Sequence, residues 1–218
     1  MSAAVPINST ALAREGGDAW RALRTLAYYR WAVAIAAIGL YLSGRTPRVI
    51  EEVNAPLFAL ACLLVGAVTL LTTITLTLRS PRLPWQIYLH AACDILSLVL
   101  LVYAGGGVDS GLGVLLITPV AGAATLTSPR IAALLAAVAA LGLLGEETLR
   151  FFKYDGTEAD LTKGGLLGTL IFLASLAANA LAQRAKTSEA LAARSHLDLA
   201  NLAQLNEAII SRMGMGVL

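Results

Sequence analysis

Residues 56–78 read PLFALACLLVGAVTLLTTITLTL, a run that contains no charged side chain. An α-helix rises about 1.5 Å per residue and the hydrocarbon core of a bilayer is about 30 Å thick, so roughly 20 apolar residues are enough to cross it. Apolar runs of similar length lie on both sides of this one along the chain. Together they predict an all-α membrane protein with a bundle of six transmembrane helices, at residues 26–43, 56–78, 83–104, 112–127, 131–152 and 164–182.

The composition agrees with a membrane protein. Of the 218 residues, 57% are hydrophobic and 14% are charged, and the mean hydropathy is +0.73. Soluble domains contain about 45–50% apolar and about 25% charged residues. The net charge of +2 is small and gives no reason to expect a direct nucleic-acid partner. Cys62 and Cys93 lie inside apolar runs, so we interpret them as small buried hydrophobic residues rather than as a disulfide or a metal-binding pair.

Lys and Arg are distributed unequally between the two sides of the predicted bundle. Of the fourteen up to Lys186, nine lie on the side of the N-terminus and five on the other side. The positive-inside rule therefore places both termini in the cytoplasm. We expect the membrane to be a bacterial inner membrane. The predicted organisation is a cytoplasmic lead-in without a cleavable signal peptide, a membrane bundle, a cytoplasmic signalling helix and the apolar beginning of a further cytoplasmic domain, at residues 1–25, 26–182, 183–213 and 214–218.

Two polar side chains lie within the third predicted span. Asp94 stands near its middle, where a carboxylate costs roughly a few kcal/mol, so it should face the bundle interior and find a partner. His90 lies four residues earlier, which puts both side chains on one face of the helix. The pair has two interpretations. It is a structural hydrogen-bonded pair that fixes the order of the helices, or it has a function, either as a proton- or ligand-responsive pair or as a docking point for a polar group on a partner helix.

A second polar group lies toward the outer end of the fifth predicted span. Glu146 and Glu147 are followed by Arg150, and Glu146 and Arg150 have the i,i+4 spacing of helical ion pairs. The sequence leaves two interpretations open for this group. It is an ion pair at the edge of the membrane, or it is a contact for a periplasmic or intramembrane partner.

Residues 183–213 predict a polar helix that continues the sixth span. Leucine and isoleucine recur there at intervals of three and four residues, which is typical of a short or imperfect coiled coil. A helix of this kind transmits movement from the membrane to the cytoplasm, and the small residues of the sixth span permit close helix packing. We therefore expect signal transmission to involve Gly168, Asn179, Leu191, Leu199, Leu202, Leu205 and Ile209.

The sequence contains no pattern that predicts a catalytic, metal or nucleotide site. Two histidines and two cysteines are scattered without the spacing of zinc ligands. His196 lacks the acidic residue that directly follows the phosphoacceptor histidine of kinases. We expect no catalytic residue, metal or cofactor in this chain.

Three stretches of the chain are recognisable as a group. Residues 94–116 read DILSLVLLVYAGGGVDSGLGVLL, residues 145–151 read GEETLRF, and residues 198–218 read DLANLAQLNEAIISRMGMGVL. Together they resemble the membrane domain of PilS-type sensor histidine kinases, which control type IV pilin transcription. The resemblance extends from about residue 23 to the end of the chain. Its last segment is the most specific part, because in that family it leads into a PAS domain.

The resemblance implies a homodimeric two-component kinase. Domains beyond Leu218 would bind ATP and Mg²⁺ and phosphorylate a PilR-like response regulator, and the membrane bundle would sense the transmembrane helix of pilin. The polar positions that match the family are Asp94, Asp109, Ser110, Glu146 and Arg150.

Two other functions remain open at the level of sequence. A small proton-coupled transporter or channel could use Asp94 and His90 at mid-membrane, although the short loops and the linker-like C-terminal helix favour a sensor. A passive anchor would only hold a cytoplasmic domain at the membrane.

Overall fold

The computed structural model describes residues 9–42, 55–79, 83–154 and 158–214, and every regular element within these ranges is helical. Long uncharged runs that would expose backbone N–H and C=O groups to lipid must satisfy them internally, which only a helix or a closed barrel does. The elements in chain order are α1 (Ser9–Leu42), α3 (Ala55–Leu78), α4 (Leu83–Ala104), η1 (Val108–Ser110), η2 (Leu112–Leu116), α5 (Ile117–Leu126), α6 (Pro129–Tyr154) and α7 (Glu158–Gly214).

Among the described residues, five helices are long and apolar enough to cross a membrane: α1, α3, α4, α6 and α7. The fourth expected span, at 112–127, is a shorter apolar helix over Leu112–Leu126. It begins with the 3₁₀-helix η2, which rises about 2.0 Å per residue, and continues as α5 at about 1.5 Å per residue. This segment is about 25 Å long, slightly less than the hydrocarbon core.

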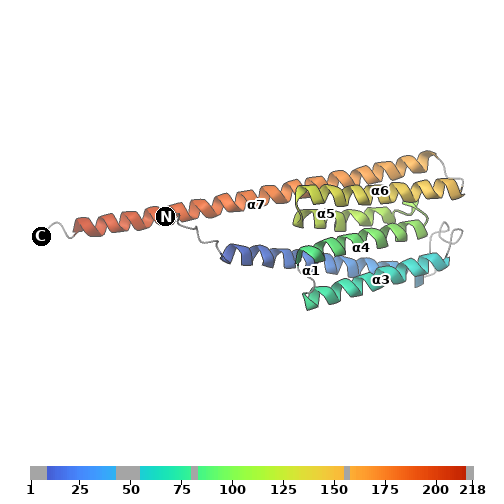
Figure 1. Cartoon of the computed structure of the whole chain (residues 1–218), viewed down its shortest axis with the longest axis horizontal. Coiled ribbons are helices and arrows are strands. Elements are labelled where there is room, and N and C mark those ends of the chain that lie inside the picture. The colour runs from blue at the N-terminus through green and yellow to red at the C-terminus, as the bar shows by residue number, and fades with distance from the viewer. Residues whose placement is uncertain (1–8, 43–54, 80–82, 155–157, 215–218) are drawn as a thin grey trace. The chain divides into compact units, whose positions relative to one another are not determined.

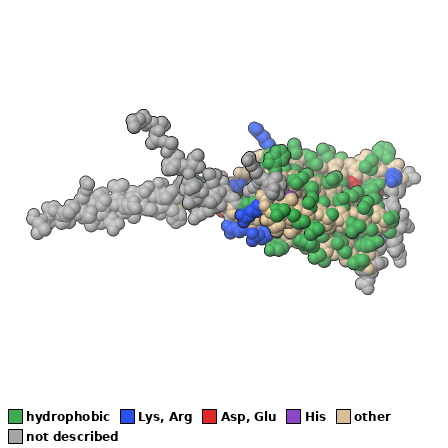
Figure 2. Space-filling view, turned by 60° about the horizontal axis from the view of Figure 1, so that its bottom comes forward, with side chains coloured by type: hydrophobic (Ala, Val, Ile, Leu, Met, Phe, Trp, Pro, Cys, Tyr) green, Lys and Arg blue, Asp and Glu red, His purple; other side chains and the backbone are tan. Residues whose placement is uncertain are grey.

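The helices of residues 1–179 form one compact unit, and residues 180–218 form a second unit that contains only the remainder of α7. In the first unit α3 packs against both α1 and α4, and α4 also packs against α5 and α6 (Figure 1). Phe58, Leu101 and Leu143 are completely buried in its core. Apolar side chains are spread over the face of this unit that Figure 2 shows, as expected where lipid replaces water as the solvent.

The two ends of the bundle differ in the elements they contain. We call the end where α1 begins and α3 and α5 finish the proximal end, and there the Arg79 guanidinium lies 5.4 Å from the centre of the Trp20 ring. The distal end holds the last residues of α4 and α6 and the first residues of α7.

A glycine-rich turn over residues 105–111, here called the distal turn, connects α4 to η2. Gly106, Gly107 and Gly111 have φ angles of 99°, 82° and 73°, which residues with a Cβ rarely adopt. Glycine is therefore the residue best suited to these three positions.

Candidate functional site

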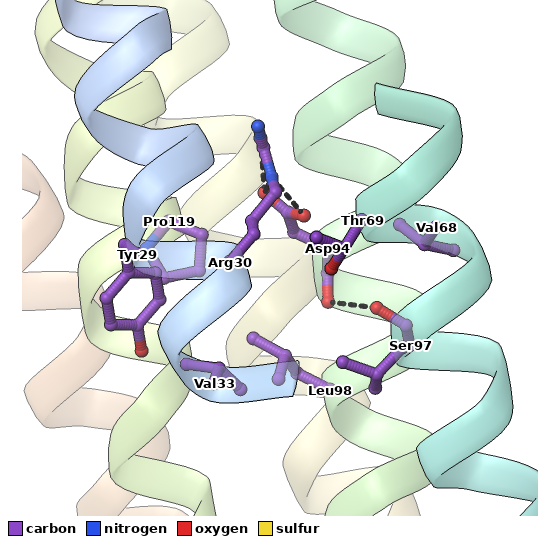
Figure 3. A pocket seen from close by; sticks show the side chains of 10 residues that line it. Tyr29, Arg30, Val33, Val68, Thr69, Asp94, Ser97, Leu98 and Pro119 are labelled. Carbon is purple, nitrogen blue, oxygen red and sulfur yellow. Dashed lines mark hydrogen bonds and ion pairs between the residues drawn. The ribbon is translucent and has the colours of Figure 1, made fainter. Parts of the chain in front are cut away.

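The most buried charged pair of the bundle joins α1 to α4 near their middles. Arg30 Nε lies 2.7 Å from Asp94 Oδ1, and Arg30 Nη2 lies 2.7 Å from Asp94 Oδ2. Both side chains are 6% exposed, and they point toward each other from neighbouring helices (Figure 3). Two parallel hydrogen bonds of this kind are the strongest arrangement available to an arginine and a carboxylate.

The position of this pair in the membrane explains why it forms. Asp94 lies about 15 Å from either end of α4, at the depth where an unpaired charge is most costly. An arginine from the facing helix neutralises the carboxylate and also fills its hydrogen-bonding capacity. The expectation that Asp94 faces the interior and has a partner is confirmed.

The expected pairing of Asp94 with His90 is wrong. His90 is buried, but its Nε2 lies 2.9 Å from the Thr75 hydroxyl of α3. Gln86, one turn earlier on α4, donates from Nε2 to the Thr75 carbonyl oxygen at 2.6 Å. An uncharged imidazole can satisfy a hydroxyl group but cannot neutralise a carboxylate, so His90 joins α3 to α4 while Asp94 joins α4 to α1.

A cavity of about 20 Å³ adjoins the Arg30–Asp94 pair. It is lined by side chains from α1, α3, α4 and α5, including Tyr29, Thr69 and Pro119 (Figure 3). Tyr29 donates its hydroxyl to the Leu115 carbonyl oxygen of η2 at 2.7 Å. A cavity of this volume admits about one water molecule and is far smaller than a site for an organic solute.

A second polar cluster lies in the distal half of α6. Glu146 and Glu147 are each 4% exposed, and Arg150 Nε lies 3.8 Å from Glu146 Oε1. Glu147 Oε1 accepts a hydrogen bond from the Val108 backbone N–H at 2.6 Å. The predicted i,i+4 ion pair is present. It lies inside the bundle and not on its surface, because the distal turn covers it.

Gly107 determines how closely this turn approaches α6. A Cβ at this position would lie 2.6 Å from Glu147 Oε1 and 2.7 Å from Arg150 Nε, so these two side chains would have to shift to make room for it. The first turns of α7 also meet the cluster, since a Cβ at Gly164 would lie 2.9 Å from Glu147 Cγ. Glu147 therefore contacts both the distal turn and α7.

The other two polar positions of the distal turn have more local roles. Asp109 forms an exposed ion pair with Lys163 of α7 at 2.7 Å. Ser110 donates its hydroxyl to the Gly107 carbonyl oxygen at 2.6 Å, and this bond closes the turn on itself. Asp109 thus provides a second contact between the turn and α7, and Ser110 stabilises the turn.

The two predicted transmission residues of the first unit both lie on the buried face of α7. A Cβ at Gly168 would lie 3.3 Å from the Ala140 carbonyl oxygen of α6, so the two backbones pack closely there. Asn179 is buried and donates from Nδ2 to the carbonyl oxygens of Ala124 and Thr127, at 2.6 and 3.1 Å. These carbonyl groups belong to the end of α5, where no further helical turn can satisfy them.

The remaining predicted transmission residues lie in the second unit. Leu191 is 61% exposed. Leu199, Leu202, Leu205 and Ile209 lie in helix α7, but their side chains are outside the described residues. The coiled coil therefore stays a prediction, as does the start of a further domain after Gly214.

Arg30 is the functional candidate that sequence reasoning missed. Tyr28, Tyr29 and Trp31 surround it, and aromatic residues beside an arginine are typical of a membrane interface, so the local sequence indicates the edge of a span. The candidate span in α1 covers Ala19–Leu42, and this places Arg30 near its centre. The available signal was a buried carboxylate in another span that needed a positive charge.

Comparison with known proteins agrees with this architecture. The model of the PilS-like transmembrane domain matches residues 13–192. This chain belongs to the PilS-like transmembrane domain family. It is 38% identical over 213 residues to the sensor protein kinase PilS of Pseudomonas aeruginosa, which covers 95% of this chain and 38% of that protein. No solved structure matches the chain.

Membership of the PilS-like family confirms the resemblance that the three sequence stretches indicated. It also agrees with a multi-pass helical membrane protein, which the apolar helices show independently. This PilS-like chain spans 38% of the length of its Pseudomonas relative, and so corresponds to the membrane part of a sensor kinase.

Proposed function

We propose that this chain is the membrane sensor of a two-component histidine kinase that regulates type IV pilin transcription. The bundle detects the transmembrane helix of pilin in the inner membrane of a bacterium. Kinase domains that follow Leu218 in a homodimeric protein use ATP and Mg²⁺ to phosphorylate a response regulator. The relation to a sensor protein kinase over 95% of this chain supports the proposal.

The proposed topology places the proximal end and both termini in the cytoplasm. Residues 1–25 precede the bundle, residues 26–182 form the sensor and residues 183–213 form the signalling helix. The excess of Lys and Arg on the proximal side supports this orientation. The distal turn, with Asp109 and Ser110, then faces the periplasm.

The observation that carries the proposal is the position of α7. This helix is held by the bundle through Gly168 and Asn179, and it extends from Glu158 to Gly214. Movement of α6 or of the end of α5 would therefore act on residues of α7, a helix whose sequence runs on to Gly214. A passive anchor would not need a buried amide at the point where the helix leaves the first unit.

A ligand changes the output only if it binds one signalling state better than the other. Two packing arrangements of the bundle would differ in which buried polar groups pair between helices, and Arg30–Asp94 is one such pair. A pilin helix against the apolar surface of the bundle would select the state whose lipid-facing side chains fit it better.

The test is ATP-dependent autophosphorylation of the full-length kinase in membranes, with and without co-expressed pilin. We expect pilin to change the rate, and Asp94→Asn to change this response while the protein still inserts at wild-type abundance. A chimera in which unrelated spans replace residues 26–182 is the matched control and should lose the response. A chimera that keeps the response to pilin would refute the proposal.

Flux measurements separate this function from transport. A sensor should pass no solute when the purified chain is reconstituted in liposomes. The cavity of about 20 Å³ and the neutralised Arg30–Asp94 pair support that expectation. Proton-coupled flux that is lost in Asp94→Asn would favour the transporter instead.

A further inference from the structure

The cluster in the distal half of α6 contains more negative than positive charge. Two carboxylates, Glu146 and Glu147, are 4% exposed, and one guanidinium, that of Arg150, lies among them. Burying a charge is tolerable only when it is paired and hydrogen-bonded. One of the two carboxylates therefore needs a further positive charge.

Glu146 is the carboxylate that makes no hydrogen bond, and its ion pair with Arg150 is long. Neither of its oxygens makes a hydrogen bond, and Arg150 Nε, at 3.8 Å, is beyond hydrogen-bonding distance. Glu147, in contrast, accepts the short bond from Val108. A buried carboxylate with two unsatisfied oxygens is rare in native proteins and requires an explanation.

The charged groups of the neighbouring elements are already engaged elsewhere. Glu147 and Arg150 act on Glu146 from its own helix. Lys163 of α7 binds Asp109 and Asp160, at 2.7 and 3.1 Å. Within the described residues, the other titratable groups near the distal end include Lys153, which is exposed and makes other interactions, Tyr103 at the end of α4, Tyr154 at the end of α6 and Glu158 at the start of α7.

The packing of the cluster decides which cation can enter. Gly107 closely approaches Glu147 and Arg150, and Gly164 closely approaches Glu147. Among the described residues, no group of three or more His, Cys, Asp and Glu side chains lies where it could hold a metal ion, and the Glu146 oxygens themselves are buried. A proton needs no space, and it would give Glu146 the O–H group with which a buried carboxyl group can donate a hydrogen bond.

We propose that Glu146 is a proton-binding site and that its occupancy controls how firmly Glu147 holds the distal turn. With Glu146 charged, Arg150 is shared between two carboxylates. With Glu146 protonated, Arg150 interacts with Glu147 alone and draws that carboxylate away from the Val108 N–H group. Glu147 also contacts α7 at Gly164. Protonation of Glu146 would therefore change the packing of Glu147 against α7, the helix of Glu158–Gly214.

The site lies nearer to the distal side of the membrane than to the proximal side. Glu146 lies about 12 Å from the end of α6 at Tyr154, and Arg150, which is 17% exposed, lies between them. In the topology of the proposed function, on which this step rests, the proton comes from the periplasm. The cluster would then add an external pH response to the signal from a membrane partner.

Infrared spectroscopy tests the site itself. The chain in lipid nanodiscs should show the carbonyl band of a protonated, buried carboxylic acid that disappears as the pH is raised. Glu146→Gln should abolish the band, and Asp109→Asn, an exposed carboxyl group at the same end, should leave it unchanged. Absence of the band from the wild-type chain at every pH, or its persistence in Glu146→Gln, would overturn the proposal.

Amide hydrogen exchange tests the link to the distal turn. Glu146→Gln imitates the protonated acid without a change of pH, so the Val108 amide should exchange faster in this variant than in the wild-type chain at alkaline pH. Equal exchange would overturn the link. If Glu146→Gln does not fold, the wild-type chain provides the same comparison. Exchange of the Val108 amide is then measured at pH values below and above the loss of the carbonyl band, and each rate is corrected for the pH dependence of intrinsic amide exchange.

A third measurement separates this inference from the proposed function. In the full-length kinase, a change of external pH at clamped internal pH should alter autophosphorylation, and Glu146→Gln should lose this response but keep the response to pilin. A response to pilin without the infrared band would leave the sensor function intact and remove the proton site. The band without any effect of external pH on phosphorylation would overturn the signalling role of the proton.

Discussion

Arg30→Met provides the sharpest test of the packing in this bundle. Methionine keeps the apolar stem that arginine packs along α1, but it removes the guanidinium that neutralises Asp94. The variant therefore leaves a carboxylate about 15 Å from either end of α4, without the three hydrogen bonds at 2.7, 3.0 and 2.7 Å. Asp94→Leu leaves the guanidinium isolated in the same way.

Two independent estimates give the size of the effect. Removing one partner of a buried ion pair costs about 3–5 kcal/mol. A single charge at the centre of a membrane helix costs about 2.5–3.5 kcal/mol on insertion scales. We therefore expect each single variant to lose about 3–4 kcal/mol, which lowers the ratio of folded to unfolded protein by a factor of about 150 to 700.

The double variant Arg30→Met/Asp94→Leu should be much more stable than the sum of the single effects predicts. Replacing both members of a buried pair by apolar residues is often neutral or even stabilising. The wild-type chain, the two single variants and the double variant form a double-mutant cycle. The stability of each is measured by reversible unfolding of the purified chain in mixed micelles, followed by the circular dichroism of its helices. Additive losses in the double variant would refute the pairing.

An exposed ion pair provides the matched control. Lys163 and Asp109 are joined at the same 2.7 Å distance as Arg30 Nη2 and Asp94 Oδ2, but their side chains are 48% and 53% exposed. Many exposed pairs contribute nothing measurable to stability, so Lys163→Ala should leave the unfolding midpoint unchanged. A loss as large as that of Arg30→Met would show that burial does not govern these energies.

Three further predictions concern the small and amide residues. Gly168→Leu should force α7 away from α6 and cost about 1–3 kcal/mol in the same unfolding assay, whereas Gly145→Leu, with open space beside it, should cost little. Asn179→Ala should cost about 1–3 kcal/mol, because two buried carbonyl groups at the end of α5 lose their donor, and amide exchange there should rise. Gly111→Ala should lose only about 1–2 kcal/mol of stability, which is what a left-handed backbone conformation costs a residue with a Cβ. Gly107→Ala should lose more, because its Cβ also meets the side chains of Glu147 and Arg150 on α6. Equal losses of stability in the two variants would contradict the close approach of Gly107 to α6.

The amino-acid sequence alone determined most of the helical architecture. Uncharged runs of about 20 residues can only be helices in a membrane, and their lengths predict which of them cross it. The i,i+4 ion pair of Glu146 and Arg150 is also a local property, and it was predicted correctly. Each of these features depends on residues within one or two helical turns.

The tertiary structure decided which polar groups meet across helices. Arg30 and Asp94 are 64 residues apart, and Asn179 is 55 residues from the carbonyl group of Ala124. Helical periodicity places a side chain on a face and at a depth, but it does not identify the neighbouring helix. His90 therefore looked like the partner of Asp94 on the basis of spacing, although a charged group on another helix was available. The neighbours are selected when all the helices pack together, because a buried charge in lipid is stable only beside its opposite.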